Sequence, residues 1–470
     1  MTFNSSPFVV FLVVALAAYW STSIHGVRKA VLLVGSLIFY AFWDYRFIAL
    51  VLYVTVVAYA GARALEAFPR SRRRILAVSV ALELGQLVFF KYTNFLLGAT
   101  SELATRIGLG LHVPRYDILL PIGVSFYTFH GVSYLVDVYR RKLPKSCDFV
   151  TVAIYIVFFP QLIAGPIVRA NVFLPQLERA AVLSVRDVVV GLKFFTIGLV
   201  YKSMFADRLA PFVDKVYGAP SAFSDRSVLF ATVGFYAQIY FDFAGYSLMA
   251  IGTSRLFGFK LPKNFDYPYR SVSVTEFWRR WHMSLSSWLR DYLYIPLGGN
   301  RHGELKQYRN LFLTMLLGGL WHGASFNFVL WGGLHGVALA LHKLYETRVV
   351  ARTALRVPYF IATPFSWLLT QTFVLIAWIP FRARGFSDTW TVLRAVSFQR
   401  EDAGLTVLTI PAALLALPLV VDTLLVQNPR LGAFRWPRRP VVTAMLLGVA
   451  LALTLPFLSL ELEKFIYFQF

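Results

Sequence analysis

Apolar stretches that approach the length of a membrane span recur from one end of the chain to the other, and no long polar linker separates them. Apolar residues make up 57% of the 470 residues and charged residues 15%, whereas soluble domains contain about 45–50% and about 25%. A soluble chain of this length would divide into several domains. The sequence instead predicts an all-α, polytopic transmembrane protein in which residues 1–470 form a single transmembrane domain.

The candidate spans differ in length, and several are shorter than the roughly 20 residues that a helix needs to cross a bilayer. We expect the short spans to be tilted, re-entrant or sheltered by neighbouring helices. The span over residues 311–342 is broken. The candidate spans cover residues 7–20, 30–44, 47–62, 75–98, 117–137, 149–165, 187–205, 227–251, 311–342, 359–381, 404–426 and 441–460.

A net charge of +22 can indicate nucleic-acid binding, but the basic residues lie in short loops between spans, as the positive-inside rule expects. Groove-reading and base-stacking motifs are absent, so we expect a lipid bilayer and no nucleic acid as a partner. Placing the basic loops in the cytoplasm puts the C-terminal tail, residues 461–470, on the extracytoplasmic side. These loops are HGVRK (25–29), PRSRRR (69–74), YRRKLPK (139–145) and FRWPRRP (434–440).

The chain contains one cysteine, Cys147, which excludes an internal disulfide. Because Cys147 follows the basic string YRRKLPKS, we expect it to face the reducing cytoplasm. No basic residue precedes the first apolar run. The N-terminal segment is therefore interpreted as a first span rather than as a signal peptide.

Hydropathy falls between about residues 252 and 310, where charges are too frequent for an ordinary span. Within this region apolar residues recur at three- and four-residue spacing and predict one apolar helical face. An amphipathic helix with such a face can lie at the membrane interface or line the mouth of a cavity. The predicted face comprises Trp281, Leu285, Trp288, Leu289, Tyr292 and Leu293.

Histidines near the middle of the chain are candidate catalytic residues. An ionisable side chain at membrane depth is costly, and imidazole exchanges protons near neutral pH. His322 lies in GGLWHG, after Gly318 and Gly319 and before Gly323. Small residues let a backbone or a ligand approach closely, and a helix break at membrane depth is tolerated where it lines a cavity. We favour a functional role for His322 over a structural role in which a neighbouring helix provides its hydrogen-bond partner.

His282 lies in the string RRWHMS and follows Glu276, Arg279 and Arg280. These charges can bind an anion such as a phosphorylated cofactor. They can equally anchor an interfacial helix at the lipid headgroups. The residues alone leave both interpretations of His282 open.

Two other polar residues lie in apolar surroundings. Asp242 belongs to YFDFAGYSLMAIG, and a buried carboxylate needs a partner, so we expect it to pair with an arginine or to orient a histidine, or to be structural. Tyr467 lies among phenylalanines in the terminal string FIYFQF. Such aromatics are typical of the interface belt, but a buried tyrosine hydroxyl next to a base is a possible nucleophile.

His335 and His342 lie farther along the apolar segment that contains His322, and structural roles are favoured for both. The sequence contains no HExxH string and no Cys/His cluster with the spacing of metal ligands, so no metal site is predicted. A GxSxG elbow and a phosphate-binding glycine-rich loop are also absent from the sequence.

Taken together, these strings resemble the membrane-bound O-acyltransferase (MBOAT) family, in particular the integral membrane subunits of alginate, peptidoglycan and exopolysaccharide O-acetylation. The resemblance covers most of the chain. Its signature positions, the histidine of the WHG motif and an upstream His or Asn, fall on His322 and His282. The strings that carry it are LPIGVSFYTFHGVSYLVDVYR, FFPQLIAGPIVR, LYIPLGGNR, LTMLLGGLWHG and FIYFQF, with those around Asp242 and His282.

The resemblance implies a multi-pass protein of the bacterial inner membrane whose helices surround a central tunnel. The catalytic region is expected over about residues 227–342. A cytoplasmic thioester donor, acetyl-CoA, would reach the central histidine, with no permanently bound cofactor, and a periplasmic SGNH-type acetyltransferase would be the partner. Tyr467 matches the tyrosine of a C-terminal motif that is implicated as an acyl carrier in the secreted-polymer branch of the family.

We therefore predict an O-acetyltransferase that passes acetyl across the membrane to an alginate-like polysaccharide, with His322 as general base, His282 as a positioning residue and Tyr467 as the nucleophile. Ala244 and Leu248 differ from the alginate-type string DFSGYSDMAIG and resemble the D-alanyl-transferring branch. Peptidoglycan, cellulose and D-alanyl substrates thus stay open. The alternative from another class is a transporter, in which membrane histidines serve proton relays.

Overall fold

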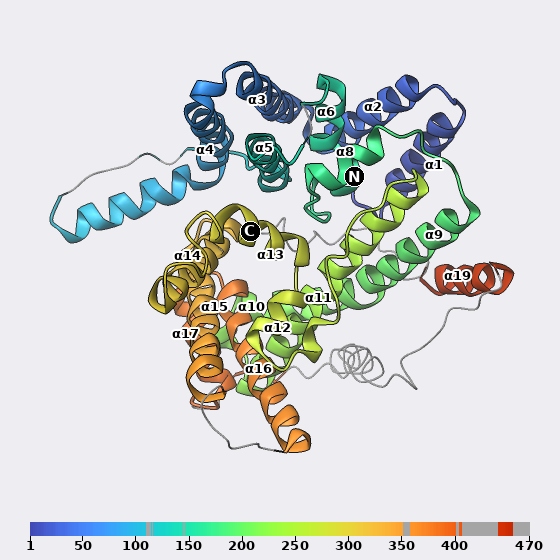
Figure 1. Ribbon diagram of the computed structural model, residues 1–470. Coiled ribbons are helices and arrows are strands. Elements are labelled where there is room, and N and C mark those ends of the chain that lie inside the picture. The colour runs from blue at the N-terminus through green and yellow to red at the C-terminus, as the bar shows by residue number, and fades with distance from the viewer. Residues whose placement is uncertain are drawn as a thin grey trace. The chain divides into compact units, whose positions relative to one another are not determined.

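The computed structural model describes residues 1–109, 114, 116–143, 146–350, 358–400, 404–406 and 440–454 (Figure 1). These residues form helices and loops with no β-strand, apart from one isolated bridge between Phe223 and Leu405. Among them, five helical segments are long and apolar enough to cross a membrane, which confirms the all-α, polytopic class. These segments are His25–Ala67, Pro69–Arg106, Val185–Gly218, Asp225–Leu256 and Ile361–Arg382.

The described residues group into two compact units. Unit 1 comprises Met1–Phe195 and Met249–Pro262, and unit 2 comprises Thr196–Leu248 and Lys263–Phe470. The prediction of a single domain over residues 1–470 stays a prediction.

Unit 1 is a bundle of helices with a core of phenylalanine rings. Phe159 packs edge-on against Phe11, with 5.2 Å between the ring centroids. Gly61 and Gly131 allow close helix packing, because a Cβ on Gly61 would lie 2.7 Å from the Leu135 side chain and one on Gly131 2.6 Å from the Glu83 carboxylate. The helices are α1 (Ser6–Trp20), α2 (His25–Asp44), α3 (Ile48–Ala67), α4 (Arg72–Arg106), α5 (Val124–Tyr139), α6 (Phe149–Val157), α7 (Phe159–Leu162), α8 (Ala170–Leu177) and most of α9 (Val185–Val200).

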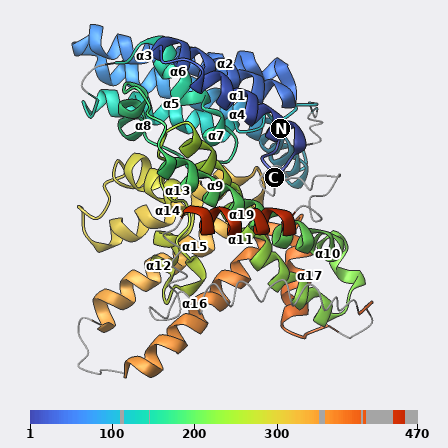
Figure 2. The same ribbon diagram turned by 90° about the vertical axis from the view of Figure 1, so that its right-hand side faces the viewer.

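Unit 2 contains the segments in which the sequence predicts the catalytic residues. Its α14 and α15 form a helical hairpin and lie side by side (Figure 2). The helices are α10 (Asp207–Gly218), most of α11 (Asp225–Leu256), α12 (Val274–Arg280), α13 (Met283–Leu289), α14 (Glu304–His322), α15 (Phe326–Tyr345), α16 (Tyr359–Arg382), α17 (Phe386–Val396) and α19 (Pro440–Thr454). Short π- and 3₁₀-helical turns join them, including η3 (Tyr201–Ala206), η5 (Pro268–Arg270), η6 (Arg290–Tyr294) and η7 (Glu346–Val350).

Most predicted spans coincide with helices, and the differences have local causes. The span over residues 311–342 is broken as predicted, between α14 and α15. The span over 117–137 becomes helical only at Val124, because Gly123 adopts a left-handed conformation with φ +76°. The span over 149–165 divides into α6 and α7 at Phe158, which leaves the helical conformation with ψ +109°. Pro160 lies in the first turn of α7, where a proline is tolerated, whereas it breaks a helix interior. Most of the span over 404–426 lies outside the described residues.

The single amphipathic helix predicted from Trp281 to Leu293 is wrong at its start. The chain leaves the helical conformation at Trp281, and His282 is left-handed with φ +41° and ψ +53°, so α12 and α13 are separate helices. The apolar face is otherwise present, because Leu285, Trp288 and Leu289 are all buried. The spacing of apolar residues predicts which side chains are buried. It does not predict where the backbone leaves the helical conformation.

Candidate active site

His322 is the last residue of α14 and is enclosed by aromatic rings. Only 4% of it is exposed. Its imidazole packs edge-on against Trp321 of its own helix, Trp331 of α15 and Phe381 of α16, with ring centroids 4.9, 5.0 and 5.2 Å away. These centroid distances fall within the usual range of about 4.5–7 Å for edge-to-face aromatic pairs. The ring therefore lies in a buried, aromatic environment that three helices contribute.

Glycines bring α15 close enough for this enclosure to form. A Cβ on Gly319 would lie 2.3 Å from the Phe328 carbonyl oxygen and 2.8 Å from the Gly332 Cα, which are both backbone atoms of α15. A Cβ on Gly323 would lie 2.1 Å from the Phe328 ring. Small residues at helix interfaces let backbones approach closely in membranes. The glycines around the WHG motif thus place Trp331 against His322.

His282 occupies the turn between α12 and α13 and is fully buried. Its ring packs edge-on against Phe243 of α11, with centroids 4.6 Å apart, and also edge-on against Trp321, with centroids 6.3 Å apart. Trp321 also contacts His322, so both predicted catalytic histidines pack against the same indole. Burial lowers the pKa of His282 to about 3, so the imidazole is neutral at pH 7.

A polar network holds His282 from one side. Its Nδ1 lies 3.0 Å from the Oδ1 atom of Asn264, a residue that is itself 1% exposed. The same oxygen accepts hydrogen bonds from the backbone N–H and the hydroxyl of Ser284, at 3.3 and 2.9 Å. The Asn264 Nδ2 donates to the Ser247 hydroxyl at 3.0 Å. Asn264 was not among the predicted site residues, because it lies in an irregular segment with no helical periodicity.

His335 and His342 each have a polar partner at Nδ1. The Trp278 indole N–H donates to His335 Nδ1 at 3.3 Å, and the His335 ring packs against Trp331 with centroids 4.8 Å apart. His342 lies 3.0 Å from the Thr275 hydroxyl through its Nδ1. Neither contact involves His282 or His322.

The partner predicted for Asp242 is corrected by the structure. Asp242 forms an ion pair with Lys202, at 2.7 Å, and the same ammonium lies 2.7 Å from Asp207. All three side chains are buried, with at most 5% of each exposed. A buried carboxylate is stabilised by any well-placed cation, and the π-helical turn η3 supplies a lysine where the sequence predicted an arginine or a histidine.

The charges that precede His282 are partly engaged with one another. Arg280 forms ion pairs with Glu276, at 2.8 Å, and with Asp266, at 3.2 Å. Arg279 is exposed. Two carboxylates therefore surround the Arg280 guanidinium, which makes it a poor ligand for an anion. Tyr467, the third predicted site residue, lies outside the described residues.

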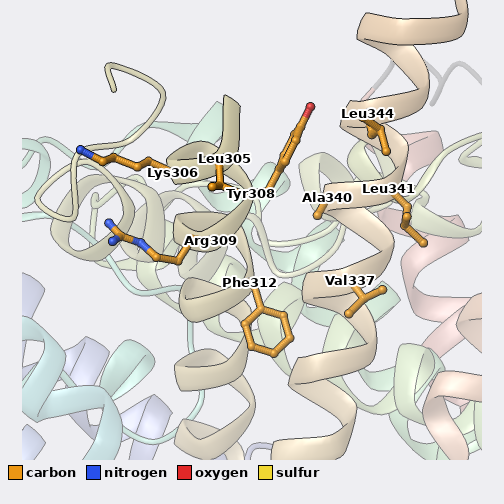
Figure 3. A pocket seen from close by; sticks show the side chains of 9 residues that line it. All are labelled: Leu305, Lys306, Tyr308, Arg309, Phe312, Val337, Ala340, Leu341 and Leu344. Atoms are coloured by element: carbon orange, nitrogen blue, oxygen red, sulfur yellow. The ribbon is translucent and has the colours of Figure 1, made fainter. Parts of the chain in front are cut away.

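A separate groove of about 660 Å³ lies between the first turns of α14 and the last turns of α15 (Figure 3). Neither His282 nor His322 contributes to its lining. The floor is apolar, and Figure 3 shows Lys306 and Arg309 extending from α14 away from α15. The lining residues are Leu305, Lys306, Tyr308, Arg309, Phe312, Val337, Ala340, Leu341 and Leu344.

Comparison with known proteins places this arrangement in a family. Residues 128–381, which include both histidines, match the model of the membrane-bound O-acyltransferase family. The chain is similar to the probable alginate O-acetylase of Pseudomonas aeruginosa, with 41% identity over 84% of this chain and 75% of that protein. It is also similar to the peptidoglycan O-acetyltransferase of Helicobacter pylori, with 35% identity over 84% and 80%.

A more distant similarity extends to the teichoic acid D-alanyltransferase of Bacillus subtilis, with 28% identity over 50% of this chain and 62% of that protein. These relatives are all acyltransferases by name, which favours the enzyme over the transporter. The chain has helices suited to several membrane crossings and is similar over most of its length to enzymes of O-acetylation. It belongs to the membrane-bound O-acyltransferase family and is a multi-pass membrane acyltransferase.

Proposed function

We propose that this protein transfers acetyl from cytoplasmic acetyl-CoA, across the bacterial inner membrane, toward an extracytoplasmic polysaccharide of the alginate type. The names of the relatives support O-acetylation of an extracytoplasmic polymer. The observation that carries the proposal is the pair of buried histidines that both contact Trp321. Ionisable side chains enclosed in this way are costly in a membrane protein, and their retention argues for chemistry.

In the proposed mechanism, His322 acts as the general base. It takes the proton from the Tyr467 hydroxyl while the phenolic oxygen attacks the thioester carbonyl, so that a C–O bond forms and the C–S bond breaks. The protonated His322 then returns the proton to the departing thiolate, which leaves as CoA. General-base catalysis of this kind contributes about 10²–10⁴-fold. His282 accepts a hydrogen bond at Nε2 and orients the donor or the nucleophile.

The second half of the reaction moves acetyl from the tyrosine to the polymer. A hydroxyl in the active site of the periplasmic SGNH-type partner attacks the aryl ester. A new C–O bond forms, the acyl C–O bond to the tyrosine breaks, and the tyrosine oxygen takes up the proton that the attacking hydroxyl loses. The partner then delivers acetyl to the polysaccharide. The tail has access to this partner if residues 461–470 lie on the extracytoplasmic side, as the basic loops predict.

The test is acetyl transfer by the purified protein in liposomes that are loaded with [acetyl-¹⁴C]CoA on one side. We expect CoA release and label on the protein with the wild type, and neither with His322→Ala. His302→Ala is the matched control, because His302 is an exposed histidine of the loop before α14, and it should behave as the wild type. Transfer by His322→Ala above a tenth of the wild-type rate would contradict the role of the base.

The same assay separates the acyl groups. A D-alanyl thioester that replaces acetyl-CoA should give no label above background if the donor is acetyl-CoA. Efficient labelling with D-alanine and none with acetyl would assign the protein to the D-alanyl branch instead.

A further inference from the structure

The amide of Asn264 has an orientation that its neighbours dictate. The backbone N–H of Ser284 points at one end of this amide, at 3.3 Å. A backbone N–H is only a donor, so the amide atom that it meets must be the oxygen. The Ser247 hydroxyl meets the other end, at 3.0 Å, where it accepts from the Nδ2 group. The oxygen of Asn264 is thereby presented to His282.

This orientation determines the tautomer of His282. An amide oxygen can only accept a hydrogen bond, and it lies 3.0 Å from His282 Nδ1. Nδ1 must therefore carry the proton, and the lone pair of the neutral imidazole is on Nε2. Among the described residues, Nε2 is buried and has no hydrogen-bond partner. A buried acceptor without a partner in the protein calls for a functional explanation.

The backbone at His282 supports the same conclusion. A non-glycine residue in the left-handed region costs on the order of 1–3 kcal/mol and persists where the surrounding structure over-determines it. His282 is in that region, with φ +41°. The ring at this turn packs against Phe243 and Trp321. Strain of this kind is concentrated at functional sites.

We propose that Asn264 is a positioning residue for acyl transfer, which holds His282 with Nδ1 protonated so that the Nε2 lone pair accepts a hydrogen bond from the substrate or the nucleophile. This inference rests on the proposed function, since it gives His282 a task in that reaction. Asn264 acts through His282 and does not itself contact the reacting groups. In the serine-protease triad, an aspartate holds the catalytic histidine in one tautomer, and replacing it with asparagine lowers kcat by about 10⁴.

The elements that pack on His282 present few ionisable groups to it. From α11, Asp242 next to Phe243 is paired with Lys202. From α14, His322 follows Trp321. From the preceding turn, Arg280 is paired with Asp266 and Glu276. A carboxylate introduced at position 264 would thus be the new charge closest to Nδ1.

The decisive variant is Asn264→Asp, which keeps the size and the accepting oxygen but adds a negative charge. An opposite charge within about 4–6 Å raises the pKa of a cation by about 1–3 units. Protonation of His282 at low pH removes the Nε2 lone pair, so activity should be lost as pH falls. From a wild-type pKa of about 3, a rise of about 3 units would lower the ratio of the Asn264→Asp rate to the wild-type rate by up to about thirtyfold from pH 8 to pH 4.5, measured as CoA release in liposomes.

Asn264→Leu removes the acceptor altogether and should lower kcat at least about tenfold at pH 7.5 with less effect on the KM for acetyl-CoA. Ser287→Ala is the matched control, because Ser287 lies on α13 and bonds to the Ser284 carbonyl at 3.0 Å; it should leave both values unchanged. If Asn264→Leu does not fold, Asn264→Asp alone decides. A flat rate ratio across pH for Asn264→Asp would overturn the proposal.

A second measurement does not depend on acyl transfer. Solid-state NMR of protein labelled with ¹⁵N-histidine in lipid, with the spectrum of His282→Asn subtracted, reports the tautomer of His282 directly. We expect the Nδ1–H tautomer in the wild type and its loss in Asn264→Leu. An Nε2–H tautomer in the wild type would overturn the assignment. If the wild type releases no CoA from acetyl-CoA, the proposed function fails while this spectrum still decides the role of Asn264.

Discussion

The hairpin of α14 and α15 offers a sharp test of why the site needs glycine. In Gly319→Ala the new Cβ would lie 2.3 Å from the Phe328 carbonyl oxygen, 2.8 Å from the Gly332 Cα and 2.9 Å from the Gly332 nitrogen. All three are backbone atoms, so no side chain can rotate away and the helices must separate. Overpacking of this kind costs about 1–3 kcal/mol.

Helix propensity acts in the opposite direction. Alanine is better than glycine in a helix interior by about 0.8–1.0 kcal/mol. At Gly333, one residue beyond Gly332 on α15, an added Cβ would lie 3.8 Å from the Leu316 side chain and 4.0 Å from the Phe312 ring, which are ordinary contacts. Gly333→Ala should therefore stabilise the protein by up to about 1 kcal/mol, whereas Gly319→Ala should destabilise it by up to about 2 kcal/mol.

The assay is thermal unfolding of both variants in the same detergent, followed by acetyl transfer in liposomes. Gly319→Ala should also lose activity, because separation of the helices moves Trp331 away from His322. Gly333→Ala should retain it. Equal stability of the two variants would refute the argument that backbone contact, rather than propensity, requires glycine at position 319.

Three further outcomes follow from individual residues. Lys202→Met should lower the free energy of unfolding by about 3–5 kcal/mol, because it leaves two buried aspartates without their shared cation; denaturation in detergent would show this, and wild-type stability would contradict it. Tyr467→Phe should abolish polymer acetylation at unchanged protein levels, since no other oxygen on that side chain can carry acetyl; near-normal acetyl content would reduce the tail to an aromatic anchor. Cys147 should react in intact cells with membrane-permeant thiol reagents only, because its basic loop is predicted to be cytoplasmic; labelling by an impermeant reagent would invert the topology.

Hydropathy and motif strings anticipated much of the fold and part of the site. The break in the span over residues 311–342 was predicted from its sequence, and it lies between α14 and α15. Both predicted histidines are buried, and they contact the same indole. The Asn264 network was missed because its residues come from different segments, and no periodicity links Asn264 with Ser247 or His282.

Asp242 is a second residue whose partner could not be predicted from the sequence. Its apolar surroundings predict that it needs a partner, since a carboxylate is costly to bury alone. The identity of the partner depends on how η3 turns, and a π-helical turn changes which side chain faces the neighbouring helix. Lys202 therefore could not be named from the local sequence.

The sequence by itself determined that the chain is a helical membrane protein and that His282 and His322 are candidate catalytic residues. The free energy of transfer from water to the membrane depends on each side chain's own chemistry, and the spacing of apolar residues is a local property of the chain. Only the tertiary structure decided what surrounds those histidines. The left-handed turn at His282 depends on contacts between distant segments, and so does the packing of Trp331 on His322 through Gly319. The hydrogen bond from His282 to Asn264 depends on them as well. Such contacts depend on side-chain packing and hydrogen bonding in three dimensions. They join residues that are far apart in the chain, so the local sequence does not predict them.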